Sequence, residues 1–600
     1  MKIINILSNP LPRNLIPMGS RLELALRTLY HRLNATRPFV NARVRKAKSS
    51  YSVWKTSRPK LPVVSATPAD GAVTFLLAVE AGKENDALET LRSLASLTQR
   101  GWRVIPVLAA GVKWDSVNDT LPDSRIFPPV REITGLRPMI EQLRTDYIVF
   151  CSAGDRFDPT LLDHFYLALG SHPAGDLYYF DCEYFNPVSG DSQPFFKPSS
   201  PSPELMLSLN YLTRAFIRSS HLAELDDRSI DKMNLQAVEY GICLDLLHRQ
   251  ALMHHIPAIL ARFDELTPDM NSAFDKVISR HLEKIINTPV TVSWSRGSRR
   301  VNWLTSEPSV SLVILNKDHG RLLRGLLESI AVITTYTNYS IVIVDNQSSE
   351  PEALRLLTEL EHRPGTRVIH YDEPFNYSTA VNLGVANADG EVVVTLNNDM
   401  LVVEPGWLRE LVQWAIRPEI GVVGGKLLHK NRSIQHTGII LGMNGFIGHL
   451  YLNAPEDYLG LAGSANWYRN FNALTGACQA FRREVFLKVG GYDPRFRLAF
   501  GDIDFCLRVT EAGFRNLYVP FAQLIHFEGS SRGYETPTPD IQLGYEVLKP
   551  WLEVDDGYFS PNLTYDTIPA CEMNPGTLNT RVARIEERRR SVNARLSPSK

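Results

Sequence analysis

Three polar residues, Asn397, Asn398 and Asp399, directly follow a near-continuous run of apolar residues at 392–396. The β-branched side chains of that run predict a strand buried on both faces, with Asp399 at its carboxyl end. In open α/β sheets ligands bind at that edge, where a carboxylate can hold a hard divalent cation against a diphosphate. The alternative is a polar turn that only closes the strand. The neighbouring segments favour the ligand site.

Those segments alternate between strand and helix patterns. Strands are predicted at 311–315, 340–344, 367–371 and 391–396, and helices at 322–332, 351–361 and 378–388. This alternation predicts right-handed crossovers and a mainly parallel sheet. Polar groups would then gather at the carboxyl ends of the strands: Asn316, Asp345, Asp372 and Asp399.

An earlier part of the chain repeats this pattern, with strands predicted at 73–79, 103–109 and 147–152 and a helix at 88–97. Residues 90–109 align without gaps on 326–345, and residues 146–155 align on 390–399. We interpret this as a duplicated domain whose first copy kept the core and lost much of the chemistry. The paired positions are Ala109 with Asp345, Asp155 with Asp399, Glu239 and Gly241 with Asp502 and Asp504, and Arg262 with His526.

Composition sets wider bounds. The 600 residues are 44% hydrophobic and 22% charged, which is typical of a soluble globular protein with more than two domains. Six cysteines without a CxxC pair argue against a zinc ribbon or a disulfide framework and favour a reducing cytosol. There is neither an apolar run of spanning length nor a signal-peptide pattern, so export or integral membrane insertion is not expected.

The first 60 residues carry a charge of about +12, which leaves the remainder near -13. From Ser20 the sequence SRLE resembles a capping box, and Leu22, Leu26, Leu29 and Leu33 follow at helical spacing. We expect this basic amphipathic helix to lie on an anionic membrane surface. The alternative is packing on the chain's own domain. Nucleic acid is not the expected partner, since aromatic and basic residues are not interleaved.

The second α/β run resembles the family 2 glycosyltransferases, which have the GT-A fold. It is similar to a bacterial branch of tandem-domain, rhamnosyltransferase-like enzymes for surface polysaccharides and O-antigen. The resemblance covers about residues 308–565 and is carried by TTYTNYSIVIVDN, EPFNYSTAVNLG, LNND, SIQHTGIILG, TGAC, GGYDPRF, FGDIDFCLR and HFEGSSRG. The first run resembles a degenerate partner domain, with FFKPSSPSPELMLSLNY as its clearest segment.

The resemblance assigns the nucleotide-sugar site. Asp345 would contact the nucleotide base, although an Asx-turn also explains it. LNND stands where the family has DxD, with Asn397 in place of the first Asp and as a candidate ribose contact. Asp399 and His526 would hold Mn²⁺ or Mg²⁺. The further donor-binding candidates are Asn316, Asp372, Asn382, Asn398 and Gly476.

FGDIDFCLR resembles the family's acidic catalytic motif, with Gly501 in the first acidic position. Asp502 then stands where the family has its catalytic base, and Asp504, on another side of the starting helix, caps or orients. The opposite assignment stays open. So does a purely structural role, because acidic residues favour helix N-termini.

The resemblance implies an inverting transfer of a sugar from a UDP- or dTDP-sugar to a hydroxyl of a saccharide or lipid-linked saccharide. The predicted organisation is a basic segment and linker at 1–65, a degenerate GT-A-like domain at 66–270, a helical connector at 271–307, a catalytic GT-A domain at 308–565 and a tail at 566–600. The expected location is cytoplasmic, peripheral on the inner face of the membrane. A sugar-phosphate nucleotidyltransferase is one alternative, which the absence of a glycine-rich phosphate loop disfavours. A non-catalytic scaffold is the other.

Overall fold

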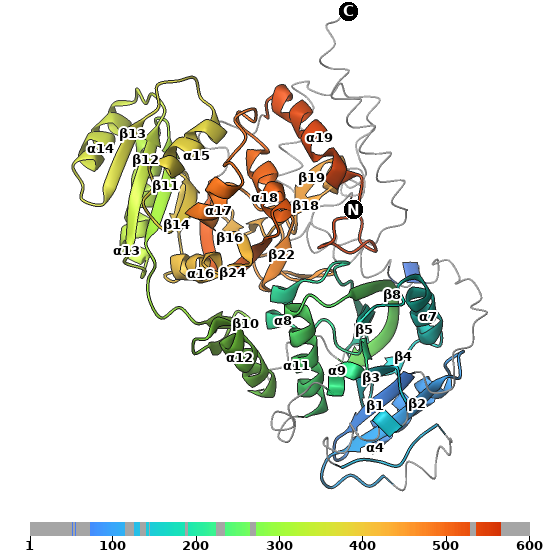
Figure 1. The fold of residues 1–600 in the computed structure, drawn as a ribbon. Coiled ribbons are helices and arrows are strands. Elements are labelled where there is room, and N and C mark those ends of the chain that lie inside the picture. The colour runs from blue at the N-terminus through green and yellow to red at the C-terminus, as the bar shows by residue number, and fades with distance from the viewer. Residues whose placement is uncertain are drawn as a thin grey trace, which may run out of the picture.

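The computed structural model describes residues 51, 54–55, 73–114, 125–131, 140–142, 144–186, 190–223, 234–264, 272–527 and 536–565. These residues form two α/β domains, the first blue to green and the second yellow to red in Figure 1. Between them lie the helix α12 (Ser272–Ile286) and a hairpin of β9 (Thr291–Ser295) and β10 (Ser298–Asn302). The predicted helical connector therefore also contains a β-hairpin.

The second domain is built on one ten-stranded sheet. Its main path runs β13 (Thr366–His370), β12 (Tyr339–Asp345), β11 (Val310–Asn316), β14 (Val392–Asn397), β23 (Cys478–Arg482), β16 (Ile420–Leu428), β24 (Arg515–His526) and β15 (Met400–Val402). Two short strands join this path, β17 (Ile434–His436) on β16 and β22 (Arg469–Phe471) on β24. Small hairpins pair β18 (Ile439–Leu441) with β19 (Ile447–His449) and β20 (Leu459–Gly460) with β21 (Gly463–Ser464).

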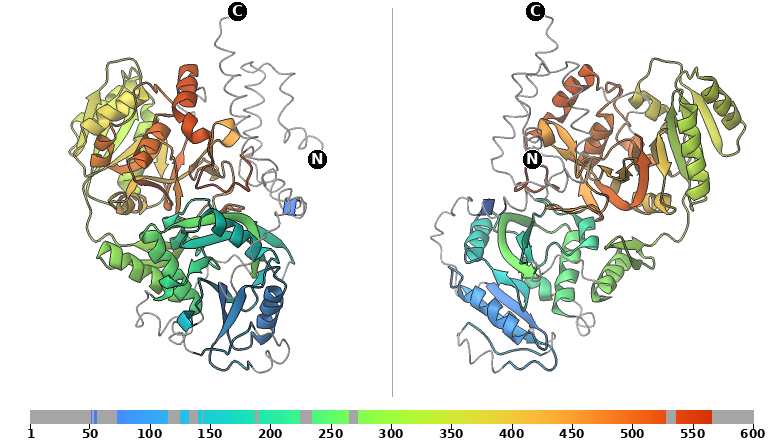
Figure 2. Two further views of the ribbon diagram at one scale, coloured as in Figure 1. Left: turned by 45° about the vertical axis from the view of Figure 1, so that its right-hand side comes forward. Right: turned by 180° about the vertical axis from the view of Figure 1, so that it is seen from behind.

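Helices cover both faces of this sheet. Successive strand residues point to opposite faces, so neighbouring residues of one strand pack against different helices. Leu312 and Ile314 of β11 pack in one core cluster with residues of α13 (Gly320–Ile333), α14 (Pro351–Glu361) and α16 (Trp407–Ala415). Val313 between them packs in the other cluster, with residues of α15 (Tyr377–Ala386), α17 (Arg483–Lys488), α18 (Gly501–Glu511) and α19 (Thr538–Leu552). Both layers are visible in Figures 1 and 2.

The first domain repeats this topology. Its sheet runs β2 (Trp102–Leu108), β1 (Val73–Val79), β3 (Tyr147–Ser152), β7 (Phe216–Arg218), β5 (Leu177–Phe185), β8 (Met253–Asp264) and β4 (Arg156–Phe157), with β6 (Ser192–Phe195) on β5. The pairs from β2–β1 to β8–β4 correspond in order to the pairs from β12–β11 to β24–β15 of the second sheet. Each pair is parallel where its counterpart is parallel and antiparallel where its counterpart is antiparallel. Its helices are α4 (Glu84–Ala95), α7 (Leu161–Ser171), α8 (Pro203–Ser208), α9 (Ser220–Ala223) and α11 (Leu235–His248).

The prediction of mainly parallel sheets is confirmed only in part, because both sheets are mixed. In the second domain β11 to β14 are parallel and each crossover between them contains a helix, and β16 and β24 also pair in parallel. After β14 the chain returns against the sheet, so that β23 is antiparallel to both of its neighbours. The repeated strand-and-helix pattern ends at the same point, which is why sequence periodicity does not reveal the antiparallel part.

The two domains contact each other directly, one above the other in both views of Figure 2. The Phe195 ring lies edge-on to the Trp467 ring, with centroids 5.9 Å apart. Ser202 Oγ and Asn470 Oδ1 are 2.8 Å apart, and Arg515 forms a 2.7 Å ion pair with the buried Glu204. The interface thus combines aromatic packing with paired buried polar groups, as a stable interface requires.

The basic segment lies almost wholly outside the described residues, including the helix predicted from Ser20. Of its described residues, Trp54 packs edge-on to Phe196 and Lys55 forms a 3.1 Å ion pair with Glu183, both in the first domain. Within the described ranges, no helix has the length and apolar character needed to cross a bilayer.

Candidate active site

Polar side chains meet at the carboxyl-terminal edge of the second sheet, as predicted. Asn316 ends β11 and pairs in register with Asp345 at the end of β12. On the other side of β11, Leu315 pairs with Asn397, the last residue of β14. Strand order alone therefore brings these three side chains to one edge.

A line of hydrogen bonds joins the asparagines to Asp345. Asn398 Nδ2 donates to Asn316 Oδ1 (2.8 Å), and Asn316 Nδ2 donates to Asp345 Oδ1 (3.3 Å). The Ser348 backbone N–H also donates to Asp345 Oδ2 (3.2 Å). The carboxylate thus forms the local turn that was the alternative explanation for it, and its contact with a nucleotide base stays a prediction.

Asp399 and His526 lie together, although 127 residues of sequence separate them. Met400 pairs in register with His526, because β15 runs antiparallel to the end of β24. His526 Nε2 is 3.2 Å from Asp399 Oδ1 and 3.3 Å from Asn397 Nδ2. The other ring nitrogen, Nδ1, is 2.8 Å from Gln435 Oε1. Since a carbonyl oxygen only accepts, Nδ1 carries a proton and Nε2 is left to face the carboxylate.

These two side chains fit a divalent cation. An oxygen of Asp399 and the imidazole Nε2 would be its protein ligands, and the hydrogen bond from Nδ1 to Gln435 is the outer contact that metal-binding histidines usually make. Among the described residues, no three histidine, cysteine or acidic side chains are grouped as a metal site. A divalent cation held by two protein side chains would take its remaining ligands from water or from a bound diphosphate.

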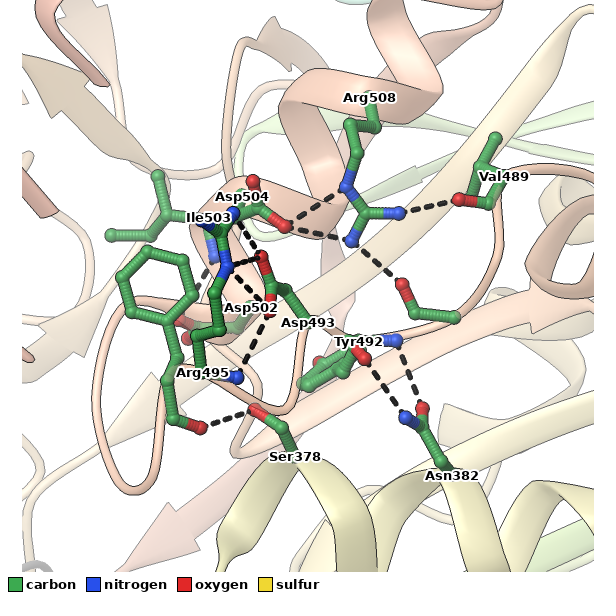
Figure 3. A network of polar contacts seen from close by, with 12 residues as sticks. Ser378, Asn382, Val489, Tyr492, Asp493, Arg495, Asp502, Ile503, Asp504 and Arg508 are labelled. Carbon is green, nitrogen blue, oxygen red and sulfur yellow. Dashed lines mark hydrogen bonds and ion pairs between the residues drawn. The ribbon is translucent and has the colours of Figure 1, made fainter. Parts of the chain in front are cut away.

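The two acidic residues in the first turn of α18 have different surroundings (Figure 3). Asp502 is partly exposed, and its carboxylate accepts the N–H groups of Gly476 (2.6 Å) and Ile503 (2.9 Å). Asp504 is buried and pairs with Arg508 at 2.7 Å. Arg508 in turn donates to the carbonyls of Val489 and Gly491. Asp504 is thus committed to a structural ion pair, whereas Asp502 lies where a substrate can approach.

Packing explains why Gly501 departs from the acidic family pattern. A Cβ at this position would lie 2.6 Å from Ser378 Oγ, which itself donates to the Phe496 carbonyl (2.7 Å). No side chain fits there unless the chain around Ser378 moves.

Tyr377 connects the two ends of the site. Its hydroxyl lies 3.1 Å from the Gly476 carbonyl and 3.2 Å from Asn397 Oδ1. A continuous series of contacts therefore runs from Asp502 through Gly476, Tyr377, Asn397 and His526 to Asp399. Neither Tyr377 nor Gln435 was selected from the sequence, although both lie inside the motifs EPFNYSTAVNLG and SIQHTGIILG.

Two predicted donor-binding residues lie outside this series. Asn382 uses both ends of its amide on the Tyr492 backbone, donating to the carbonyl (2.8 Å) and accepting from the N–H (2.9 Å) (Figure 3). Asp372 is exposed, and its backbone carbonyl accepts from Gln347. For Asn382 this geometry favours positioning of the Tyr492 segment.

The buried His436 and the half-buried His449 form a pair close to His526. His436 follows Gln435 in sequence, and its Nδ1 is 2.8 Å from His449 Nδ1. Burial lowers the pKa of His436 well below its ordinary value, and the neighbouring His449 and His526 lower it further. His436 is therefore neutral at physiological pH and adds no charge behind the candidate cation site.

The corresponding place in the first domain is filled by an arginine. Arg214 Nε and Nη2 lie 2.7 and 3.1 Å from the two oxygens of the buried Asp155. Its backbone N–H donates to Glu239 Oε1 (2.6 Å), as Gly476 N–H donates to Asp502. In the sequence, Arg262 is paired with His526. Arg262 does hold the register position of His526, but its guanidinium lies over the Phe185 ring, 4.5 Å from the centroid.

Comparison with known proteins identifies the class to which this fold and site belong. Residues 309–490 match the family described as Glycosyl transferase family 2. The second half of the chain therefore carries a family 2 glycosyltransferase domain.

Two curated relatives specify the branch. The chain is 33% identical over 436 residues to the O-antigen biosynthesis protein RfbC of Myxococcus xanthus, a match that covers 70% of this chain and 34% of that protein. It is 25% identical over 248 residues to the N-acetylglucosaminyl-diphospho-decaprenol L-rhamnosyltransferase of Mycobacterium tuberculosis, covering 37% of this chain and 77% of that protein. These similarities agree with the rhamnosyltransferase-like O-antigen branch predicted from the motifs. The chain spans about a third of the length of RfbC.

A solved structure of GalNAc-T7 with UDP, GalNAc and Mn²⁺ also resembles part of the chain. It has a TM-score of 0.36 and 17% sequence identity, and the match covers 43% of this chain and 50% of that one. A likeness at this level does not place a ligand here.

Proposed function

We propose that this chain is an inverting glycosyltransferase that transfers a sugar from a nucleoside-diphosphate sugar to a hydroxyl group of a growing, lipid-linked surface polysaccharide or O-antigen. The observation that carries the proposal is the continuous series of contacts between Asp502 and Asp399 along one sheet edge. The partly exposed carboxylate of Asp502 lies at one end of this series, and the proposed cation ligands Asp399 and His526 lie at the other. Such an arrangement suits a sugar bound between an acceptor and a diphosphate leaving group.

Asp502 is the proposed general base. Its carboxylate removes the proton of the acceptor hydroxyl, whose oxygen forms a bond to the anomeric carbon as the bond to the diphosphate oxygen breaks. The N–H groups of Gly476 and Ile503 hold the carboxylate in one orientation. Asp504 keeps α18 in place through Arg508 and takes no part in the proton transfer.

Asp399 and His526 are the proposed ligands of Mn²⁺ or Mg²⁺. When bound, such a cation neutralises the charge that develops on the departing diphosphate. Gln435 fixes the tautomer that leaves His526 Nε2 free for this role.

Asp345 and the neighbouring asparagines are the proposed donor contacts. The Asn398–Asn316–Asp345 line holds the carboxylate of Asp345 at the sheet edge, where it can accept an N–H of a pyrimidine base. This favours a UDP- or dTDP-sugar, and the rhamnosyltransferase among the relatives makes dTDP-rhamnose the first donor to test.

The first domain is the proposed non-catalytic partner. Arg214 occupies the position beside Asp155 at which a cation would have to bind, and Ala109 offers no carboxylate to a base. The interface with the second domain gives this copy a structural role. The basic segment at 1–65 remains the proposed contact with the anionic inner face of the membrane.

The proposal is tested by incubating the protein with UDP-, dTDP- and GDP-sugars and Mn²⁺ and measuring release of the nucleoside diphosphate. We expect turnover of one donor, lost with EDTA and in Asp399→Ala. Asp389→Ala is the control, because Asp389 is an exposed carboxylate paired only with Arg367 in the described structure. Formation of a nucleotide sugar from a nucleoside triphosphate and a sugar phosphate would instead support the nucleotidyltransferase alternative.

A further inference from the structure

We propose that Asp540, on a helix outside the motifs of the site, is a positioning residue for the catalytic base Asp502. The inference rests on the proposed function, since it assigns Asp540 a role only if Asp502 is the base. Asp540 lies in the first turn of α19 and is 1% exposed. A buried carboxylate needs partners, and those of Asp540 lie in the segment that leads into α18.

The carboxylate of Asp540 accepts three consecutive backbone N–H groups. Arg497 N–H donates to Oδ1 (3.3 Å), and Leu498 and Ala499 N–H donate to Oδ2 (2.7 and 2.9 Å). Only an ionised carboxylate can accept all three without presenting a donor of its own. The position of the segment 497–499 therefore depends on this one side chain.

α15 and its N-cap residue Asn376 contact residues 494–497, which lead into this segment. The Tyr377 backbone N–H donates to the Arg497 carbonyl (2.7 Å), and Ser378 Oγ donates to the Phe496 carbonyl (2.7 Å). Asn376 Nδ2 donates to the Pro494 carbonyl (2.8 Å). The segment thus lies between α15, which belongs to the donor half of the site, and Asp540.

The held segment ends directly at the base. Phe500 adopts a left-handed conformation (φ 70°), and α18 begins at the next residue, with Asp502 in its first turn. A side chain rarely adopts this conformation unless its surroundings fix it. Here the Phe500 ring packs edge-on to Phe446, which stacks on Tyr545 of α19 at 4.1 Å. Asp540 and Tyr545 therefore tie the entry of α18 to one helix.

The contacts predict a specific kinetic effect. Loosening residues 497–499 shifts the start of α18 and with it the Asp502 carboxylate, whereas Asp345, Asp399 and His526 lie on other elements. Asp540→Asn replaces an accepting oxygen by an NH₂ group, which opposes the backbone donors. We expect kcat to fall at least tenfold while KM for the nucleotide sugar stays within about twofold.

The matched control is Glu307→Gln. Glu307 also accepts backbone N–H groups, of Thr337 (2.8 Å) and Asn338 (3.4 Å), but it does so at the opposite edge of the sheet. The control should keep kcat within about twofold. Steady-state rates are measured with dTDP-rhamnose, or with whichever donor the panel shows to be turned over, and thermal unfolding verifies that each variant is folded. A kcat for Asp540→Asn equal to that of the control overturns the inference.

Two further measurements separate this inference from the proposed function. In an Asp502→Asn background, Asp540→Asn should lower the residual rate no further, because the two residues act through one group. An Asp502→Asn variant that transfers sugar as fast as the parent would contradict the proposed function itself. Hydrogen exchange needs no donor: amides 497–499 should exchange faster in Asp540→Asn, together with the first turn of α18. Unchanged protection of that turn would overturn the inference even if no donor is found.

Discussion

In both copies of the domain, a backbone N–H in an LTxA turn donates to a carboxylate on a helix that follows in the sequence. In the second copy the turn is LTGA at 474–477 and the acceptor is Asp502. In the first copy it is LTRA at 212–215 and the acceptor is Glu239. The backbone contact is thus retained, and the third residue of the turn is different.

That single difference separates an open site from a closed one. At Gly476 a Cβ would already lie 3.0 Å from the Cβ of Asp502, so only glycine leaves the space beside the carboxylate free. At Arg214 the side chain fills the equivalent space and pairs with Asp155 through two nitrogens. A buried carboxylate pair needs a positive partner, and here the chain supplies it itself. The comparison teaches that one side chain can occupy the place of the proposed cation while the fold is kept.

The largest effect should come from removing a carboxylate in each copy. We expect Asp502→Asn to lower transfer by about 10²- to 10⁴-fold, the range typical of general-base catalysis. Asp155→Ala should leave transfer within about twofold, because the first copy is the proposed non-catalytic partner; since the change also breaks the buried Asp155–Arg214 pair, thermal unfolding must show that the variant is folded. Initial rates of nucleoside-diphosphate release decide the matter. Equal losses in the two variants would mean that the first copy is also an active centre.

Arg214→Ala tests whether the guanidinium of Arg214 takes the place of a cation beside Asp155. Without the guanidinium, Asp155 loses its ion-pair partner, whereas Glu239 keeps the backbone N–H of residue 214 and loses only the nearby positive charge. Breaking a buried ion pair typically costs about 3–5 kcal/mol of the free energy of unfolding. Chemical denaturation measures this loss. Arg92→Ala is the control, since the exposed Arg92–Glu89 pair should contribute about 0.2–1 kcal/mol.

The unfolding temperature of Arg214→Ala with and without Mn²⁺ gives a second measurement. Mn²⁺ should raise the unfolding temperature of Arg214→Ala more than that of the parent, because a cation can then bind beside Asp155. An equal rise in both proteins would mean that Arg214 does not stand in for a cation.

Glu239→Gln tests the electrostatics of the closed site. Burial raises the pKa of Glu239 to about 7 from 4.5, against the lowering effect of Arg214. The folded chain thus keeps a proton that the unfolded chain releases. Stability is therefore full below about pH 4.5 and falls as pH rises to about 7, by about 3 kcal/mol. Gln resembles the protonated acid, so the variant should lose this part of the pH dependence. Chemical denaturation of the parent and of Glu239→Gln at pH 5 and pH 7.5 provides the comparison. If the free energy of unfolding changes equally between the two pH values in both proteins, the raised pKa of Glu239 is contradicted.

Gly476→Ala tests the open site with the smallest change. The added methyl group would press on Asp502, with its Oδ2 3.3 Å away, and we expect transfer to fall about tenfold with nucleotide binding retained. Isothermal titration with UDP or dTDP and Mn²⁺ measures the binding. A loss of binding together with the rate would show that Gly476 serves the donor more than the base.

Sequence patterns predicted the half of each fold that alternates regularly. The strands at 73–79 and 147–152 and the helix at 351–361 have the predicted bounds. The meeting of Asn316, Asp345 and Asn397 followed from the rule that parallel strands end at one edge. Tyr377, Gln435 and Asp540 could not be found in this way, because each acts through contacts with segments distant in sequence.

Arg214 illustrates a different limit. The gap-free repeat alignment ended at Asp155, and Arg214 follows Asp155 by 59 positions whereas Gly476 follows Asp399 by 77, a difference of 18 residues. A single gap would have paired Arg214 with Gly476. The periodicity of the chain contains no such signal, and the conserved contact became visible only through the hydrogen bonds of the two turns.

The contact between Asn562 and Asp181 has a consequence for the order in which the protein is made. Asn562 Nδ2 donates to the buried Asp181 (2.7 Å) across 381 residues of sequence, and Gly557 accepts from the Ser200 N–H (2.7 Å). A ribosome that adds about 5–20 residues per second needs roughly 20–75 s to cover that distance. During this time the first copy has emerged, but the surface that receives Asn562 is still uncovered. Asp181 and the Ser200 N–H therefore receive these partners only when the catalytic domain is almost complete, so the surface of the first copy is finished by the last part of the second.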